Sequence, residues 1–170
     1  MNNQILKQKE LEEIEKNYDP QLSFRKLGVR LEIIVSVLLV LMSVYHFWAS
    51  GFGLVREVLH RGIHISFVLA LVFLLFGWNK KEDLKKTNKG YFYFQNIPIL
   101  DCIFAFLAVA SALYLPLLPS KELASIVGNP GSVDVFIGSI LIILTLEAAR
   151  RSVGSTLPII AIIFTLFALF

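Results

Sequence analysis

The sequence has a single cysteine, Cys102, and only three histidines among its 170 residues. One cysteine excludes an internal disulfide framework and a multi-cysteine metal site. The histidines, at 46, 60 and 64, are too few and too scattered along the chain to predict a metal centre. No glycine-rich phosphate loop, nucleophile elbow or zinc signature occurs. We therefore expect no catalytic residue, no metal and no cofactor.

Charge is also scarce, at 17% of residues against about 25% in an average soluble domain. Apolar residues reach 56% and lie in long runs with almost no charge, while Lys and Arg gather between the runs. This arrangement predicts an all-α integral membrane protein. The net charge of +3 is then explained by cytoplasmic loops and contact with anionic lipid, and we expect no nucleic acid partner.

Four apolar runs are long enough to predict transmembrane helices, and a fifth run begins after them. Twenty helical residues extend about 30 Å, the thickness of a bilayer core. We expect spans at about 31–50, 63–78 (with a helix start as early as Leu54), 97–118 and 133–149, and the start of a fifth helix at 157–170. Pro158 lies near the beginning of that fifth helix, where proline is tolerated.

The distribution of basic residues predicts the orientation. Residues 80–89, KKEDLKKTNK, place five Lys in one short loop, and such loops stay on the cytoplasmic side. Alternation of the spans then puts the N-terminus in the cytoplasm. Residues 1–28 are a polar cytosolic tail, in which residues 11–18 have helical spacing. This tail is either solvated or a short helix on the membrane or a partner.

Arg61 and His64 are the candidate functional residues on the outer side. They lie three residues apart on one face of a helix. They could hold an anionic lipid headgroup or a partner carboxylate, but snorkelling to the membrane surface is the simplest interpretation. A metal site or proton relay that uses His60 and His64 is a less favoured alternative.

The candidates on the inner side are Asp101 and a charged corner made by Glu147, Arg150 and Arg151. Asp101 falls one turn into its helix, so it is either a partner for the helix dipole, which we favour, or a functional carboxylate. Glu147 precedes the two arginines by three and four residues, a spacing that predicts ion pairs on one helix face.

Two stretches carry a resemblance to a known family. Residues 51–75 read GFGLVREVLHRGIHISFVLALVFLL, and residues 132–170 read SVDVFIGSILIILTLEAARRSVGSTLPIIAIIFTLFALF. The second is the more specific, because a span ending in LEAARR is followed by a G-x-x-L-P entry into a Phe-rich helix. Over about residues 25–170, the chain resembles the N-terminal part of the fused permeases of tripartite ATP-independent periplasmic (TRAP) transporters, of the type served by a TAXI-class solute receptor.

The resemblance implies a division of the chain. In that family a small four-helix region braces a much larger transport region, which binds substrate and coupling ions and works as an elevator. Residues 29–150 would be the small region, and residues 151–170 a corner and the start of a fifth helix leading to the large region. The large region is missing from the 170 residues, so the chain is expected to be a fragment, a truncated reading frame or a split subunit.

The implied function is that of a membrane scaffold segment in ion-gradient-driven uptake of small organic anions, in a prokaryotic cytoplasmic (inner) membrane. The implied partners are the large permease region or subunit, a periplasmic TAXI-type receptor and membrane lipid. Substrate sites in secondary transporters use broken helices near the midplane. None of the first four runs has a midplane charge or a Gly/Pro break, so no substrate-binding residue is assignable.

Two other functions compete with this interpretation. The alternative is a free-standing small membrane protein that regulates or assembles another membrane complex through its Lys-rich loop and N-terminal tail. A membrane enzyme would need His60, His64 and Asp101 to converge. The expected topology puts the histidines and Asp101 on opposite sides, about 30 Å apart, so we expect no enzyme.

Overall fold

The structure, a computed structural model, describes residues 24–25, 27–53, 55–78, 93–94 and 97–169. Four of its helices are long and apolar enough to cross a membrane, which makes the chain an all-α multi-pass membrane protein. They are α2 (Val29–Phe52), α3 (Glu57–Leu75), α4 (Ile99–Leu117) and α6 (Ser132–Ser152). The polar tail, for which a solvated segment and a short helix at 11–18 were the alternatives, and the Lys-rich loop at 80–89 lie outside the described residues.

The observed helices follow the predicted spans, with shifts at their ends. The third helix, α4, begins at Ile99 directly after Pro98 and ends at Leu117. The second, α3, ends at Leu75 and not at the expected residue 78, because Phe76 adopts an extended backbone with φ −103° and ψ 124°. The segment between the third and fourth spans contains a short helix, α5 (Ser120–Ile126), which was not predicted. Its Lys, Glu, Leu and Ala residues form helices readily.

A two-residue hairpin precedes α4 and was not predicted. Strand β1 (Tyr93–Phe94) pairs antiparallel with β2 (Ile97–Pro98), with Phe94 opposite Ile97. Ile97 is fully buried. Strand β2 runs directly into α4, so the hairpin holds the start of this helix.

The antiparallel pair of α3 and α4 is the tightest contact in the bundle. Gly62 of α3 faces Pro116 of α4 so closely that a Cβ built on the glycine would lie 2.3 Å from the Pro116 Cγ. Small residues let membrane helices approach in this way. Helix α6 packs beside this pair. A buried core joins the three helices and consists of Leu69, Phe73, Ala105, Ala108, Leu144 and Ala148.

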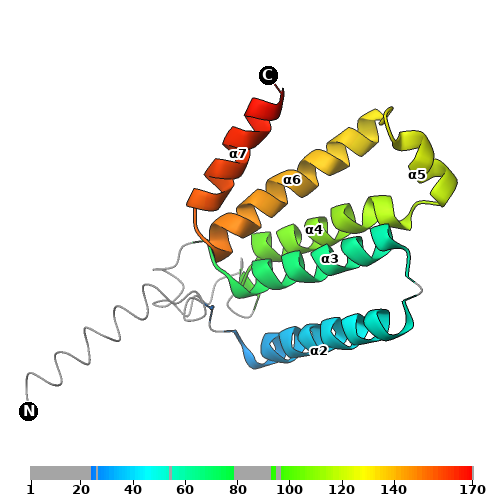
Figure 1. The fold of residues 1–170 in the computed structure, drawn as a ribbon. Helices are drawn as coiled ribbons and strands as arrows, with labels where there is room; N and C mark the ends of the chain where they lie inside the picture. Colours follow the sequence, from blue (N-terminus) through cyan, green and yellow to red (C-terminus); the bar gives the residue numbers. More distant parts are fainter. Residues whose placement is uncertain (1–23, 26, 54, 79–92, 95–96, 170) are drawn as a thin grey trace, which may run out of the picture.

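Helix α2 lies apart from these three helices (Figure 1). Of its 24 residues only Leu31 and Val35 are buried, and both are near its start. Between α2 and the α3–α4 pair there is an apolar cavity of about 280 Å³, lined from the three helices by residues that include Leu38, Phe67 and Val109. The rest of α2 is therefore held by contacts at its two ends rather than by a continuous core.

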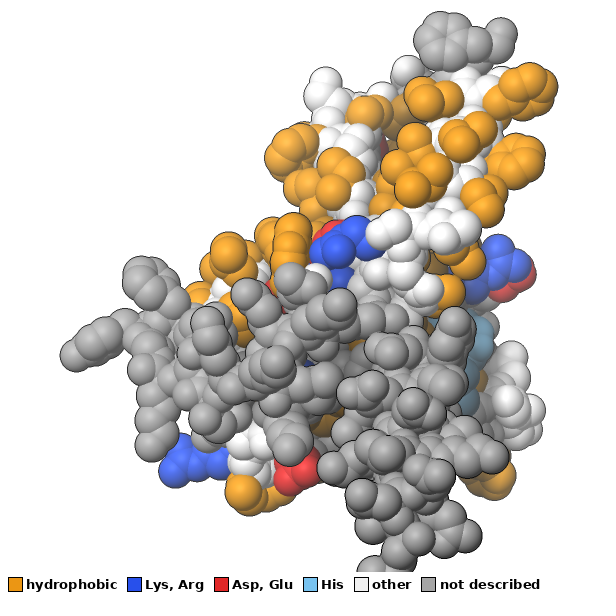
Figure 2. Space-filling model, turned by 90° about the vertical axis from the view of Figure 1, so that its left-hand side faces the viewer, with side chains coloured by type: hydrophobic (Ala, Val, Ile, Leu, Met, Phe, Trp, Pro, Cys, Tyr) orange, Lys and Arg blue, Asp and Glu red, His pale blue; other side chains and the backbone are white. Residues whose placement is uncertain are grey.

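Helix α7 (Thr156–Leu169) follows α6 after a turn at Gly154, whose φ of 106° suits glycine. It runs back along the direction of α6 but diverges from it (Figure 1). Pro158 is buried, whereas most of its other apolar side chains are exposed. Figure 2 shows hydrophobic side chains over most of the described surface of this region.

The bundle has two ends, which we name by their residues. Helices α2 and α4 begin, and α3 and α6 end, at the Asp101 end. The opposite end, where α2 ends and α3 begins, is the histidine end.

Candidate functional site

Asp101 lies in the first turn of α4, as expected, and its side chain is only 4% exposed. Its two oxygens bind two arginines: Oδ2 accepts from Nη2 of Arg25 at 2.7 Å, and Oδ1 accepts from Nη1 of Arg151 at 2.8 Å. The interpretation of Asp101 as mainly a partner for the helix dipole is therefore incomplete, because the carboxylate also joins three separate segments.

The last turn of α6 supplies the other half of the site. Glu147 accepts two hydrogen bonds from Arg150, from Nε at 2.7 Å and from Nη2 at 2.8 Å, and one from Nε of Arg151 at 2.7 Å. Both ion pairs predicted from the spacing are present. Arg151 therefore bridges two carboxylates, Glu147 on its own helix and Asp101 on α4. We call these four residues and Arg25 the charge cluster.

Aromatic rings enclose the guanidinium of Arg151, whose side chain is completely buried. Its Cζ lies 5.1 Å from the ring centroid of Phe73, 5.2 Å from Trp78 and 5.8 Å from Phe104. Arg150 also lies over the Trp78 ring, with its Cζ 4.7 Å from the ring centroid. Arginine stacks well on aromatic faces because its charge is delocalised and weakly hydrated. Arg151 is thus held by charge on one side and by rings on the other.

Arg25 was not recognised as a site residue from the sequence, where it belongs to the polar tail. Its side chain is 2% exposed, and its backbone N–H donates to the carbonyl of Leu75 at the end of α3. The neighbouring Phe24 ring packs edge-on against Phe76, with the ring centroids 5.0 Å apart. The segment before α2 is therefore fastened to α3 and α4. The only signal for this in the sequence is that Arg25 and Asp101 belong to the same end of the bundle.

The charge cluster is suited to holding helices together rather than to catalysis. Both carboxylates are occupied by arginines, so neither is free to act as a base or ligand. Among the described residues, no group of three His, Cys, Asp or Glu side chains could hold a metal ion. Removing one member of a buried ion pair costs about 3–5 kcal/mol, because the other charge stays buried.

The histidine end contains a second polar cluster, formed by Tyr45, His46, His60 and His64. Nε2 of His46 lies 2.9 Å from Nδ1 of His64, and the Tyr45 hydroxyl lies 3.1 Å from Nδ1 of His60. The histidines are scattered along the sequence but lie close together in the structure, so the interpretation of them as scattered is wrong. An antiparallel hairpin brings together residues that are equally far from its turn, and His46 and His64 each lie nine residues from Val55. That spacing was the signal in the sequence.

Arg61 lies beside this cluster, but it pairs with Glu57 of its own helix. Both side chains are more than 70% exposed, so this pair contributes little to stability. The structure does not join Arg61 to His64, although the two residues share a helix. It also keeps His60 and His64 at the opposite end of the bundle from Asp101 (Figure 1).

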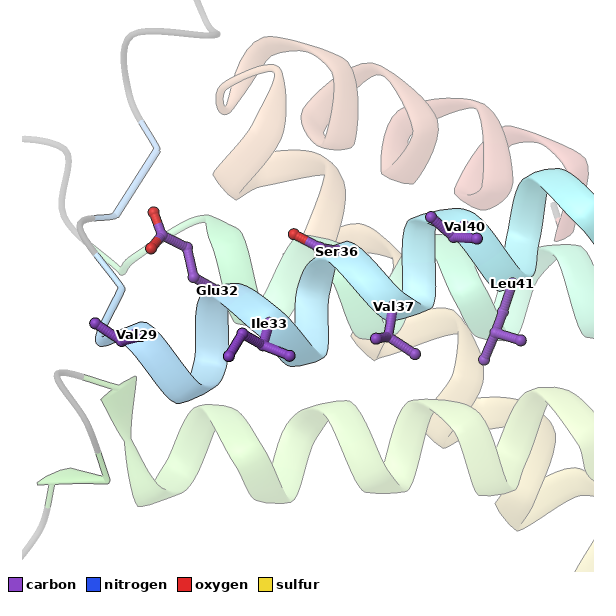
Figure 3. A pocket seen from close by; sticks show the side chains of 7 residues that line it. All are labelled: Val29, Glu32, Ile33, Ser36, Val37, Val40 and Leu41. Carbon is purple, nitrogen blue, oxygen red and sulfur yellow. The ribbon is translucent and has the colours of Figure 1, made fainter.

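A further hollow lies along the exposed face of α2 (Figure 3). Glu32 and Ser36 are its polar side chains, and the others are aliphatic: Val29, Ile33, Val37, Val40 and Leu41. All seven residues belong to one helix, so the hollow has no facing wall from another described element. It is a ridged helix surface rather than a binding pocket.

We compared the chain with models of known protein families, with curated proteins and with solved structures, and none of them matches it. The resemblance to TRAP permeases therefore depends on residues 51–75 and 132–170 of this sequence alone.

Proposed function

We propose that this chain is the membrane scaffold segment of a TRAP-type secondary transporter, which supports ion-gradient-driven uptake of small organic anions delivered by a periplasmic TAXI-type receptor. The observation that carries the proposal is the position of Arg151. This residue lies in the LEAARR corner on which the resemblance depends, and its buried side chain joins α6 to Asp101 of α4. A bracing region needs such a rigid junction next to the point where the chain leaves it.

The exposed surface of α7 supports the same proposal. Helix α7 packs mainly on α6 and leaves large apolar side chains such as Ile163, Phe164 and Phe167 exposed. In the proposed assembly these side chains contact the large transport region. The charge cluster then holds α6, and with it the start of α7, at a fixed place relative to α3 and α4.

The proposal includes an orientation and a location. Residues 1–28 and the Asp101 end face the cytoplasm of a prokaryotic cell, and the histidine end faces the periplasm. The Lys-rich loop at 80–89 and the arginines at 150 and 151 then follow the positive-inside rule. The short helix α5 lies at the periplasmic face, where the receptor would approach.

The experiment that tests the proposal has two steps. An immunoblot of native membranes with an antibody against residues 80–89 gives the mass of the product that contains this chain. A photoreactive phenylalanine analogue at Phe164 of α7, which is 69% exposed, is then crosslinked in the same membranes. Phe106 of α4, which is 72% exposed, is the matched control.

We expect crosslinks from position 164, mapped by peptide mass spectrometry, to a multi-span transport region, and lipid adducts from position 106. The transport region would lie in the same polypeptide if the immunoblot band is several times larger than 19.2 kDa, or in a separate subunit if it is not. A product of 19.2 kDa whose position 164 gives only lipid adducts would contradict the proposal. It would favour the free-standing membrane protein instead.

A further inference from the structure

The bond between His46 and His64 has a definite donor and acceptor. Nδ1 of His46 lies 2.7 Å from the backbone carbonyl of Met42, which can only accept, so this nitrogen carries a hydrogen. In a neutral ring Nε2 is then an acceptor, and Nδ1 of His64 donates to it across 2.9 Å. The proton positions of both rings are therefore determined by one backbone carbonyl.

Acid acts on the His46–His64 hydrogen bond in two steps, because the pair can take up two protons. When one proton is added at Nε2 of His64, Nδ1 of that ring still donates to Nε2 of His46, so the hydrogen bond persists. When both rings are charged, all four nitrogens carry hydrogens and no acceptor remains between them. The two imidazolium groups then repel each other. The His46–His64 contact tolerates one added proton and is broken by the second.

The neighbouring contact between Tyr45 and His60 does not respond in this way. A tyrosine hydroxyl both donates and accepts, so it can donate to neutral His60 or accept from the charged ring. The His60 ring also borders a cavity of about 260 Å³, lined by residues of both helices, in which Glu57 is the acidic side chain. Protonation of His60 therefore leaves its bond to α2 in place.

The charged groups of α3, α4 and α6 at the histidine end make ion pairs or hydrogen bonds, and α5 adds one charge of each sign, Lys121 and Glu122. Glu57 binds Arg61 on α3, Arg56 binds the Pro116 carbonyl at the end of α4, and the Tyr114 hydroxyl of α4 donates to Asp134 of α6. Among the described residues, Glu57 is the acidic group nearest to the histidines in sequence, and its pairing with Arg61 leaves the local charge balanced. Additional positive charge on the rings is therefore not neutralised.

Besides the His46–His64 contact, α2 is held at this end by the Tyr45–His60 bond and by its short connection to α3 after Phe52, and its middle has few buried contacts. Its buried residues, Leu31 and Val35, lie near its start, and the apolar cavity of about 280 Å³ separates its middle from α3 and α4. At the Asp101 end the segment before α2 is fixed by the charge cluster. Loss of the His46–His64 contact would therefore let the middle of α2 move away from α3 between its two fastened ends.

We propose that the His46–His64 contact is a proton-operated clasp between α2 and α3. It is closed while the pair holds at most one added proton, and it opens when both rings are charged. Histidine is the side chain whose ordinary change of charge falls between pH 5 and 8. The clasp would report acidity at the membrane face where the histidine end lies, and it is independent of the proposed transport function.

The test measures the distance between α2 and α6 with the full chain in lipid nanodiscs, which expose both faces to the buffer. Nitroxide labels are placed at Ser43→Cys and Ser139→Cys, two exposed serines, in a Cys102→Ala background. Double electron–electron resonance is recorded at pH 7.5 and pH 4.5. We expect one short distance at pH 7.5 and a second, longer distance at pH 4.5 that disappears when the sample is returned to pH 7.5.

Amide variants separate a clasp from general acid unfolding. In His64→Asn the amide sits where Nδ1 was and can donate or accept, so we expect the longer distance at pH 4.5 to be lost. His46→Gln does the same from the other ring and serves if His64→Asn does not fold. His60→Asn is the matched control and should keep the response. The proposal is overturned if the native pair shows no second distance, if the amide variants at 46 or 64 retain it, or if His60→Asn abolishes it.

Discussion

Replacing Asp101 by leucine is expected to destabilise the bundle strongly. The carboxylate is 4% exposed and accepts from two buried arginines at 2.7 and 2.8 Å. Its removal leaves Arg25 and Arg151 facing an apolar side chain, although Arg151 keeps Glu147. Breaking a buried pair by removing one partner costs about 3–5 kcal/mol. Water does not screen these charges, because the three side chains are buried. We therefore expect Asp101→Leu to lower the free energy of unfolding by about that amount.

A double variant tests the reason for this loss. In Arg25→Met/Asp101→Leu, one positive and one negative charge are removed together, and the surplus of one positive charge in the cluster is unchanged. Replacement of a buried pair by apolar residues is often close to neutral. The lost interaction with the dipole of α4, about 0.3–1 kcal/mol, is common to both variants and cancels in their comparison. We expect the double variant to be more stable than Asp101→Leu alone.

The measurement is reversible unfolding by SDS in mixed micelles, followed by far-UV circular dichroism. Arg61→Gln is the control, because its exposed pair with Glu57 should be worth at most about 1 kcal/mol. The reasoning would be refuted if Asp101→Leu were no more destabilising than Arg61→Gln. It would also be refuted if adding Arg25→Met further destabilised Asp101→Leu, because Arg25 would then not depend on that carboxylate.

Two further outcomes are expected from the same unfolding assay. Gly62→Ala should cost about 1–3 kcal/mol by overpacking, because its Cβ would lie 2.3 Å from Pro116. The control Gly138→Ala, whose Cβ would have no atom within 4 Å, should not destabilise α6. Equal stability of the two variants would contradict the close packing of α3 and α4. Tyr114→Phe should lower the unfolding midpoint by removing the 2.8 Å bond to Asp134 that links α4 to α6, and an unchanged midpoint would show that this bond adds nothing.

The positions of the helices could be predicted because membrane insertion is decided by local composition. A run of about twenty apolar residues has to satisfy its backbone hydrogen bonds within itself, so it becomes a helix. The prediction placed the first, third and fourth spans within three residues of α2, α4 and α6. It placed the end of α3 too late, because Phe76 and Trp78 are apolar enough to extend the run although the chain has already turned.

The pairing of Glu147 with both arginines was also predictable, since helix geometry brings residues three and four apart onto one face. The sites were not predictable in full, because their other contacts join distant parts of the chain. Arg25 and Asp101 are 76 residues apart, and Arg151 and Asp101 are 50 apart. Side chains at one end of a bundle meet only when the rotation of each helix about its axis is known.

The sequence by itself determined that this is a multi-pass helical membrane protein and which charged residues lie at the ends of its helices, because hydropathy and helical spacing are local properties. The orientation in the membrane and the transport role remain predictions. Only the tertiary structure decided that one aspartate joins two arginines and that all three histidines gather between α2 and α3. These contacts depend on how apolar helix faces pack against one another, and several rotations of such uniformly apolar helices are compatible with the same sequence pattern.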